Sequence, residues 1–542
     1  MFVQCLENEG VEYIFGIPGE ENEAFIMALR DSKIKFISTR HEQGAAFMAD
    51  VYGRLTGKAG VCLSTLGPGA TNLITGVADA NLDRAPLVAL TAQGDLKRQH
   101  KESHQHIDIV QAFKPITKWN AKVVSPIIIP EVVRKAFRVA QIEKPGATHI
   151  ELPEDVAEKE TDLHPMHVTP NPSFIPNESE LSKAAMLIKD SKNPMILIGN
   201  GAVRSRASEE VKEFAEKNNI PVTNTFMSKG VLSHDHPLCL FTVGLQAKDY
   251  VMCNFDQADL IITIGYDLVE YAPSFWNKTN TKSIVHIDSK PAEVDFFYHP
   301  EVELVGDIKI TLKKLTHLTK FNKKMPDYPN KLRKFILNQF EENRQSTDFP
   351  VKPQKLIWDL REAMAPDDIL ISDVGAHKVW IARMFPTKKP NTCIISNGFA
   401  SMGIAVPGAI AAKLANPDVN IVAATGDGGF LMNSQELETA KRLGVHFTVV
   451  IFTDKKYGLC EWKQQDHYKK TFGVDFTNPD FVMYAESFGA KGYSVKKTED
   501  LLPLLKKAIK AKEISIIEVP VDYRENFKLS EELGKDICNL FY

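Results

Sequence analysis

Short runs of apolar, β-branched residues alternate along the chain with longer stretches whose apolar positions recur at helical spacing. This alternation is typical of parallel sheets covered by helices, because strands buried on both faces are apolar throughout. The fold class it predicts is α/β, with three doubly wound parallel-sheet domains. The predicted strands are 35–39, 61–65, 86–92 and 147–152, then 194–199, 259–265 and 283–288, and finally 369–372, 421–425, 446–453 and 514–519.

Two stretches interrupted by prolines separate these blocks. Residues 163–177 are polar and carry four prolines, a composition typical of linkers, and residues 320–353 are charged and also contain four prolines. The predicted domains are 1–165, 178–325 and 350–525, followed by a C-terminal tail at 526–542. The length of 542 residues is consistent with this number of domains.

Composition narrows the class of protein. The 65 basic and 69 acidic residues leave a net charge of −4 with no Lys/Arg block, which argues against nucleic acid as the main partner. The uncharged stretches 59–78 and 391–412 are long enough to span a membrane. They are rich in Gly, Pro, Ser, Thr and Asn, so we predict strand–loop–helix segments near a ligand and no membrane association.

The seven cysteines form no CxxC pair and their number is odd. We therefore expect no disulfide framework and a reducing, cytoplasmic location. The chain opens with no charged leader followed by an apolar core, so we also expect no signal peptide.

The strongest candidate for chemistry is the sequence GDGG at 426–429, directly after a predicted strand. Asp454 ends the next predicted strand, 27 residues after Asp427. Parallel neighbouring strands would place both carboxylates at one sheet edge, where they would suit Mg²⁺ and a phosphate group. The alternative, a glycine-rich turn with an Asp helix cap, is disfavoured by the paired strand ends.

This motif resembles the magnesium–diphosphate motif of thiamine diphosphate-dependent enzymes. Further similar segments are FGIPG at 15–19, RHEQGAA at 40–46 and LGPGATN at 66–72, in the order of that superfamily, and the resemblance spans about residues 10–534. It implies a pyrimidine-binding first domain, a Rossmann-like middle domain and a diphosphate-binding third domain. Thiamine diphosphate and Mg²⁺ are the implied cofactors, with Asp427, Asp454 and the Lys456 carbonyl as metal ligands.

The resemblance also assigns roles to individual residues. Glu42 would exchange a proton with the cofactor's aminopyrimidine ring, although it could be only a helix-end acid beside Arg40. Met402 would wedge the cofactor into its bent conformation, with an ordinary core methionine as the alternative. The implied cofactor-binding residues are Pro18, Glu42, Thr65, Asn72, Val374, Gly375, Ala376, His377, Met402, Gly426, Asp427, Gly428, Gly429, Tyr457, Gly458 and Leu459. Family members often carry Gln where this chain has Ala376.

Within the superfamily the chain is similar to the acetolactate synthases, in the segments LKR at 96–98, SHQ at 103–105, FKPITK at 113–118, ELETA at 436–440 and YAESFGAKG at 484–492. That similarity implies condensation of two pyruvate molecules to 2-acetolactate with release of CO₂, through an ylid and an enamine of the cofactor. Gln93 and Gln105 would lie near pyruvate, or be surface glutamines. The superfamily forms its sites between subunits, which implies a homodimer or homotetramer.

Four other functions are weighed as alternatives. The biosynthetic acetohydroxyacid synthases bind FAD through an Arg-containing stretch, whereas residues 264–271 here contain no Arg, so FAD is not expected. Another thiamine-dependent 2-oxo acid decarboxylase would often carry paired histidines, and no such pair is present. A non-catalytic scaffold is disfavoured because Glu42, Asp427 and Asp454 are all retained. A dinucleotide-binding dehydrogenase would need G-x-G-x-x-G after a strand, which is absent.

Overall fold

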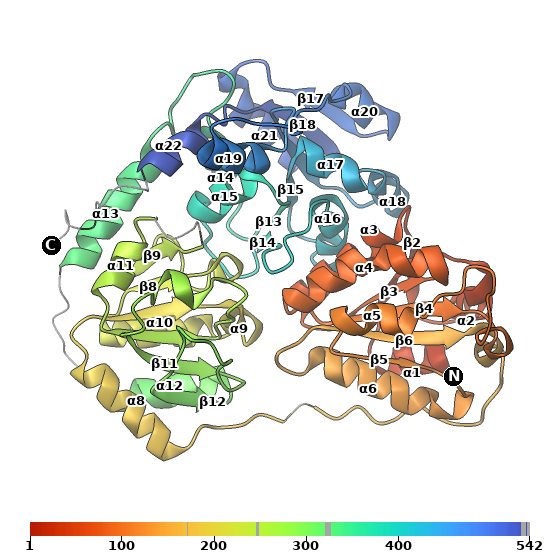
Figure 1. Cartoon of the computed structure of the whole chain (residues 1–542). Coiled ribbons are helices and arrows are strands. Elements are labelled where there is room, and N and C mark those ends of the chain that lie inside the picture. The colour runs from red at the N-terminus through yellow and green to blue at the C-terminus, as the bar shows by residue number, and fades with distance from the viewer. Residues whose placement is uncertain (171, 245–248, 320–326, 533–537, 539–542) are drawn as a thin grey trace.

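The computed structural model describes residues 1–170, 172–244, 249–319, 327–532 and 538. Its three six-stranded sheets occupy successive parts of the chain, and every pairing of neighbouring strands is parallel. The predicted α/β class is confirmed. Figure 1 shows the third sheet above the other two, which lie side by side. Within the described ranges, no helix is both long and apolar enough to cross a membrane.

The first sheet has the strand order β2-β1-β3-β4-β6-β5. Its strands are β1 (Tyr13–Gly16), β2 (Lys35–Ser38), β3 (Gly60–Ser64), β4 (Leu87–Gln93), β5 (Trp119–Lys122) and β6 (Ala147–Pro153). Its helices are α1 (Phe2–Asn8), α2 (Glu23–Arg30), α3 (Glu42–Thr56), α4 (Gly67–Leu82), α5 (Ile109–Phe113), α6 (Ile129–Gln141) and α7 (Glu154–Ala157). One core lies under α3 and α4, and a separate core lies under α1 and α6 on the other face.

The second sheet has the order β12-β11-β10-β7-β8-β9. Its strands are β7 (Pro194–Ile198), β8 (Val222–Asn224), β9 (Cys239–Thr242), β10 (Leu260–Ile264), β11 (Ser283–Asp288) and β12 (Val302–Val305). The helices around it are α8 (Glu178–Asp190), α9 (Asn200–Arg204), α10 (Ser208–Asn218), α11 (Met252–Gln257) and α12 (Ile308–Leu318). The central strand β10 is buried along its whole length, in keeping with its apolar sequence, which only Thr263 interrupts.

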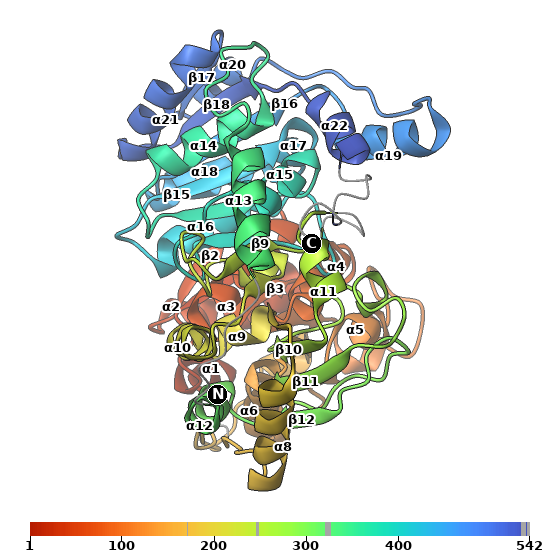
Figure 2. The same cartoon turned by 90° about the vertical axis from the view of Figure 1, so that its left-hand side faces the viewer.

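The third sheet has the order β14-β13-β15-β16-β18-β17. Its strands are β13 (Ile369–Ser372), β14 (Cys393–Ile395), β15 (Ile421–Gly426), β16 (Thr448–Thr453), β17 (Lys491–Ser494) and β18 (Ser515–Pro520). The helices are α14 (Pro353–Ala363), α15 (Ala376–Met384), α16 (Ala405–Ala415), α17 (Asp427–Asn433), α18 (Glu436–Leu443), α19 (Gly458–Tyr468), α20 (Phe481–Ser487), α21 (Leu501–Lys510) and α22 (Glu525–Glu532). Helix α22 lies against α19 in both views (Figure 1 and Figure 2).

The apolar core of the third sheet is shared with both other domains. Alternate residues of each strand point to opposite faces, so Ile371 and Ala423 face α16 while Leu370 and Val422 face the other way. The first face merges with the core under α3, because α16 packs against that helix. The second merges with the core of the middle domain. The three sheets are therefore one continuously packed body.

Every strand predicted from the sequence is present, to within two residues at each end. The sequence analysis did not identify the short strands β1, β5, β8, β9, β12, β14 and β17. Within the stretch predicted to be a linker, residues 163–170 and 172–176 have no regular structure. In the second stretch between the blocks, residues 320–326 lie outside the described residues, and helix α13 (Tyr328–Glu341) follows them. The predicted tail 526–542 is described only in part, and its beginning belongs to α22.

The cysteines were expected to form no disulfide framework, yet one pair is bonded. Cys253 on α11 is bonded to Cys538, which joins the middle domain to the C-terminal part of the chain. The two residues are 285 positions apart, so no local spacing motif could reveal the pair. The other cysteines are free, and only Cys460 among them is exposed.

A buried ion network ties the first domain to the third. Arg54 of α3 contacts Asp50 at 2.6 Å, Asp79 at 2.9 Å and Asp83 at 2.8 Å, and the three carboxylates are fully buried. Asp79 also accepts a hydrogen bond from the Ser396 hydroxyl at 2.6 Å. Because one cation balances several buried anions, its charge is needed for the packing of α3, α4 and the segment after β14.

We expect Arg54→Met to lower the free energy of unfolding by about 3–5 kcal/mol, because the aspartates lose their buried counter-charge. Urea unfolding followed by circular dichroism measures the change. The control is Arg138→Met on the exposed side of α6, where the expected change is below about 0.5 kcal/mol. Equal stability of Arg54→Met and the parent protein would contradict this role.

Candidate active site

Loops at the carboxyl edge of the third sheet enclose a cavity of about 210 Å³. Most of its lining follows β13, β15 and β16, which are adjacent strands of this sheet, and the rest comes from the segments after β14 and β18. Their polar side chains therefore converge at the edge where parallel α/β sheets bind ligands.

All the cofactor-binding and metal-binding residues predicted on the third domain line this one cavity. They are Val374, Gly375, Ala376, His377, Met402, Gly426, Asp427, Gly428, Gly429, Asp454, Lys456, Tyr457, Gly458 and Leu459. The cavity is also lined by Ala400, Phe452, Cys460 and Tyr523, which the sequence analysis did not single out. Their contribution comes from packing, which leaves no motif in the sequence.

Glycines at two positions allow the backbone to come close to neighbouring carboxylates. A Cβ on Gly429 would lie 2.9 Å from Asp373 Oδ1, and one on Gly458 would lie 2.8 Å from Asp454 Oδ2. Both distances are shorter than real Cβ contacts, so a side chain at either position would have to displace the neighbouring carboxylate. Helix α17 begins at Asp427 and helix α19 begins at Gly458. The free N–H groups at a helix start, beside glycines that leave the backbone exposed, suit a phosphate group.

Two carboxylates meet beside this backbone. Asp427 Oδ2 accepts hydrogen bonds from the Lys455 N–H and from Asn478 Nδ2, both at 2.8 Å. Asp454 Oδ2 is buried without a hydrogen-bond partner. Burial, together with the charge of Asp427, raises the pKa of Asp454 to about 7. A hard divalent cation would satisfy the unpartnered oxygen and remove the repulsion, so the donor set fits the predicted metal.

Lys456 and His377 contribute in different ways. The Lys456 ammonium is held by Glu461, so it is the lysine's backbone carbonyl that is left for the predicted metal contact. The His377 ring lines the cavity, and its buried Nε2 has no hydrogen-bond partner. Burial lowers the pKa of His377 to about 3, which keeps the ring neutral and suits it to one hydrogen bond with a ligand.

Met402 is held in the cavity wall by Asp373, which follows β13. The Asp373 carboxylate accepts backbone hydrogen bonds from Val374 at 2.7 Å, Gly403 at 2.9 Å and Ala405 at 3.2 Å. It thereby joins the first loop of the cavity to the segment that carries Met402. No role for Asp373 was predicted from the sequence.

The predicted pyrimidine-side residues form a second cluster on the first sheet. Glu42 begins α3 and is 8% exposed, and Asn72 Nδ2 donates a hydrogen bond to its Oε2 at 2.9 Å. Thr65 follows β3, and its hydroxyl donates to Glu21 at 2.8 Å. Pro18 lies exposed in the loop after β1, next to a glycine that packs on Thr65.

The two glutamines predicted near pyruvate differ in their surroundings. Gln93 ends β4 and is fully buried, with its Nε2 donating to Glu151 at 3.2 Å and to the Ile107 carbonyl at 3.1 Å. The alternative of a surface glutamine is therefore wrong for Gln93. Gln105 is exposed, and its backbone carbonyl packs against Gly67.

The two clusters are separate within one chain. None of Pro18, Glu42, Thr65, Asn72, Gln93 and Gln105 lines the cavity on the third sheet. They are connected through a residue that the sequence analysis missed. The buried Glu436 carboxylate of α18 accepts hydrogen bonds from the backbone N–H groups of Arg40 and His41, both at 3.0 Å, just ahead of Glu42.

Comparison with protein-family models matches the three domains to three models. Residues 1–112 match the N-terminal TPP binding domain of thiamine pyrophosphate enzymes, residues 181–315 match the central domain, and residues 373–519 match the C-terminal TPP binding domain. Each model falls on one of the three sheets.

Comparison with curated proteins finds relatives along the whole chain. The acetolactate synthase of Bacillus subtilis (strain 168) is 36% identical, over 100% of this chain and 96% of the relative. The catabolic acetolactate synthase of Raoultella terrigena is 37% identical, over 98% and 96%. A probable acetolactate synthase large subunit of Methanococcus aeolicus is 37% identical, over 96% and 91%.

We expect Asp373→Ala to lower the free energy of unfolding by about 3 kcal/mol, because three backbone N–H groups lose their buried acceptor. Chemical unfolding measures this change. Asp373→Asn keeps one acceptor oxygen and should lose about half as much. The exposed Asp418→Ala serves as the control and should change stability little. A loss no larger than that of the control would show that the carboxylate does not hold the Met402 segment.

Proposed function

The chain belongs to the acetolactate synthase family of thiamine pyrophosphate enzymes, and we propose that it condenses two molecules of pyruvate to 2-acetolactate with release of CO₂. We further propose that it is of the catabolic, flavin-independent type. The observation that carries the reaction is the similarity to two acetolactate synthases over at least 96% of both chains.

We propose thiamine diphosphate and Mg²⁺ as the cofactors, and the cavity on the third sheet supports them. When bound, the thiamine supplies a carbon nucleophile and an electron sink that no side chain provides. Asp427, Asp454 and the Lys456 carbonyl would hold the metal, and the backbone around Gly428 and Gly458 would hold the diphosphate. Among the described residues, no group of three or more acidic, His or Cys side chains is arranged so that it could hold a metal ion, so this metal would depend on carbonyl and phosphate oxygens for its remaining ligands.

The proposed role of Glu42 is to hold and exchange a proton at its carboxyl group. The side chain lies at the start of a buried helix and is oriented by the Asn72 amide. Water has little access to this carboxylate, so a proton placed there can pass to a bound ligand instead of to solvent.

We propose a homodimer or homotetramer in which each active site lies between two subunits. The support is the separation of the two residue clusters: Glu42 does not line the cavity that contains Asp427 in the same chain. In this arrangement the Glu42 cluster of one subunit would cover the cavity of its partner. Pyruvate would bind near Gln93 and Gln105 at that junction.

The flavin-independent type is favoured over an FAD-containing biosynthetic enzyme by the middle domain. Glu270 is buried against the start of α9, where its Oε1 accepts the Asn200 N–H at 2.9 Å. A Cβ on Gly199 would lie 2.8 Å from the same oxygen. A carboxylate thus fills the strand-to-helix turn at which a dinucleotide phosphate would be expected to bind. Asp267, which like Glu270 lies in the Arg-free stretch 264–271, forms an ion pair with Lys144 at 2.7 Å.

We expect the purified protein to convert pyruvate to 2-acetolactate and CO₂ in a ratio of one to one, with thiamine diphosphate and Mg²⁺ present and no flavin added. Product analysis by NMR measures both compounds. Added FAD should leave the rate unchanged. Formation of acetaldehyde alone would identify a decarboxylase instead, and a strict need for FAD would exclude the flavin-independent type.

We expect Glu42→Gln to reduce kcat with pyruvate by about 100-fold or more, because the amide cannot exchange the proton. Cofactor binding, followed by fluorescence quenching, should change far less. Glu131→Gln, at an exposed position of α6 in the same domain, is the matched control and should retain full activity. Undiminished turnover by Glu42→Gln would remove the proton-exchange role.

A further inference from the structure

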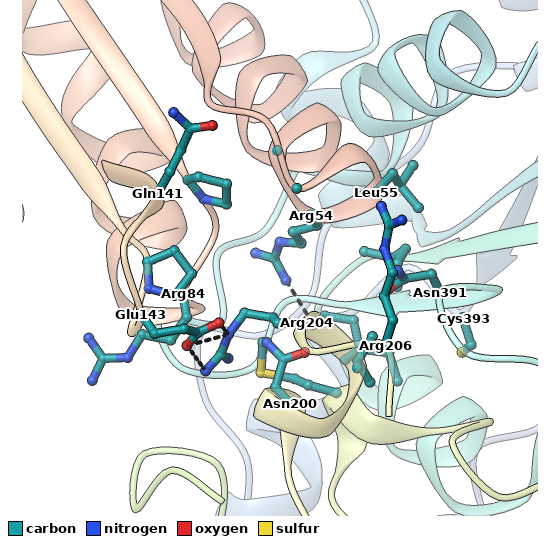
Figure 3. Close-up of a pocket in the computed structure, with 18 residues that line it drawn as sticks. Arg54, Leu55, Arg84, Gln141, Glu143, Asn200, Arg204, Arg206, Asn391 and Cys393 are labelled. Carbon is teal, nitrogen blue, oxygen red and sulfur yellow. Dashed lines mark hydrogen bonds and ion pairs between the residues drawn. The ribbon is translucent and has the colours of Figure 1, made fainter. Parts of the chain in front are cut away.

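A second cavity, of about 170 Å³, lies where the three domains meet (Figure 3). Its walls come from the end of α3, the turn after α4, the segment after α6, helix α9 and the start of β14. It shares no lining residue with the cavity on the third sheet. It is therefore separate from the proposed cofactor site.

The lining of this cavity is cationic. Four arginines line it, namely Arg54, Arg84, Arg204 and Arg206, against one acidic residue, Glu143. Two of the arginines have their charge largely balanced by the protein. Arg54 is held by three buried aspartates, and Arg84 lies 3.4 Å from Asp267, which also pairs with Lys144.

The other two arginines have unused binding capacity. Arg204 Nη2 contacts Glu143 at 3.1 Å, but Arg204 Nη1 is buried and has no hydrogen-bond partner. Buried donors of this kind are rare in folded proteins and indicate a missing ligand or water. Arg206 is exposed at the cavity and forms no ion pair with any residue that the structure describes. Its φ of 54° is unusual outside glycine and is typical of positions that the fold constrains.

The remaining lining suits a small organic molecule better than a bare ion. Side-chain amides come from Gln141, Asn200 and Asn391, and apolar groups from Leu55 and Met227. Figure 3 shows residues of all three domains facing this space. A volume of about 170 Å³ is several times the roughly 30 Å³ that one water occupies in the liquid, so more than a single solvent molecule fits.

We propose that this cavity binds a small organic anion through its phosphate or carboxylate group, with Arg204 Nη1 and the Arg206 guanidinium as the donors. A guanidinium presents parallel N–H groups that match the oxygens of either anion. Glu143 holds the Arg204 guanidinium in place through their ion pair. The proposal concerns a site beyond the proposed reaction and does not rest on it.

The test is equilibrium dialysis of the full-length protein, saturated with thiamine diphosphate and Mg²⁺ so that the cofactor site is occupied. Radiolabelled inorganic phosphate is the probe in one arm, and radiolabelled succinate is the probe in the other. We expect saturable binding of at least one probe, with one molecule bound per chain. Tighter binding of phosphate would identify a phosphate-bearing ligand, and tighter binding of succinate a carboxylate-bearing one.

Two variants address the two donors separately. Arg206→Gln removes an exposed charge, and Arg204→Lys keeps the pairing with Glu143 while removing Nη1. Each should weaken binding of the preferred probe at least tenfold. Arg138→Gln removes an exposed arginine outside the cavity and should leave binding unchanged.

Absence of saturable binding of both probes to the parent protein would overturn the proposal. So would binding that neither Arg206→Gln nor Arg204→Lys weakens, or that Arg138→Gln weakens equally. Because Arg206 is exposed, its substitution should not affect folding, which circular dichroism verifies. The experiment measures binding and not turnover. The site can therefore be tested even if the protein does not react with pyruvate.

Discussion

The repulsion between Asp427 and Asp454 is the constraint from which the organisation of the site follows. Strands β15 and β16 are paired in register, with Gly426 opposite Phe452, so the residues that follow them cannot move apart. Burial makes the repulsion costly and raises the pKa of Asp454 to about 7. A cation removes this cost, and a cation beside side-chain-free backbone in turn favours a phosphate group. In the proposed site, binding of the diphosphate thus depends on the metal, and binding of the metal depends on the two carboxylates.

The same sheet edge also sets the position of the reactive part of the proposed site. Asp373 follows β13, beside β15, and its carboxylate holds the segment that carries Met402. On the first domain, Glu436 accepts the N–H groups that precede Glu42 and so fixes the start of α3. Glu436 belongs to the third domain. In the proposed oligomer, one chain would contribute Glu42 to one active site and the cavity on its third sheet to another. Glu436 therefore links the two active sites.

The sequence predicts these features to very different extents. The central strands are recognisable because they are buried on both faces, whereas β5 and β17, which lie at sheet edges, are only half-buried and carry polar residues. The loops of the cavity are recognisable because close backbone approach requires glycine, as at Gly429 and Gly458. The contacts of Glu436 with Arg40 and His41 join residues about 400 positions apart, and the Cys253–Cys538 bond joins residues 285 apart. Such pairs depend on how domains pack, so no local pattern reveals them.

Helix α9 shows how one short element can present two different environments. At its start the backbone N–H of Asn200 is already bonded to the Glu270 carboxylate, so that end offers no donor to a ligand anion. Its last residue is Arg204, whose Nη1 remains without a partner where the three domains meet. In the middle domain, the donor at the strand-to-helix turn is therefore bonded to a carboxylate of the protein itself. The donor at the domain junction, Arg204 Nη1, is left for a ligand anion. A ligand at that junction would contact all three domains at once, whereas one bound at the turn would contact mainly the middle domain.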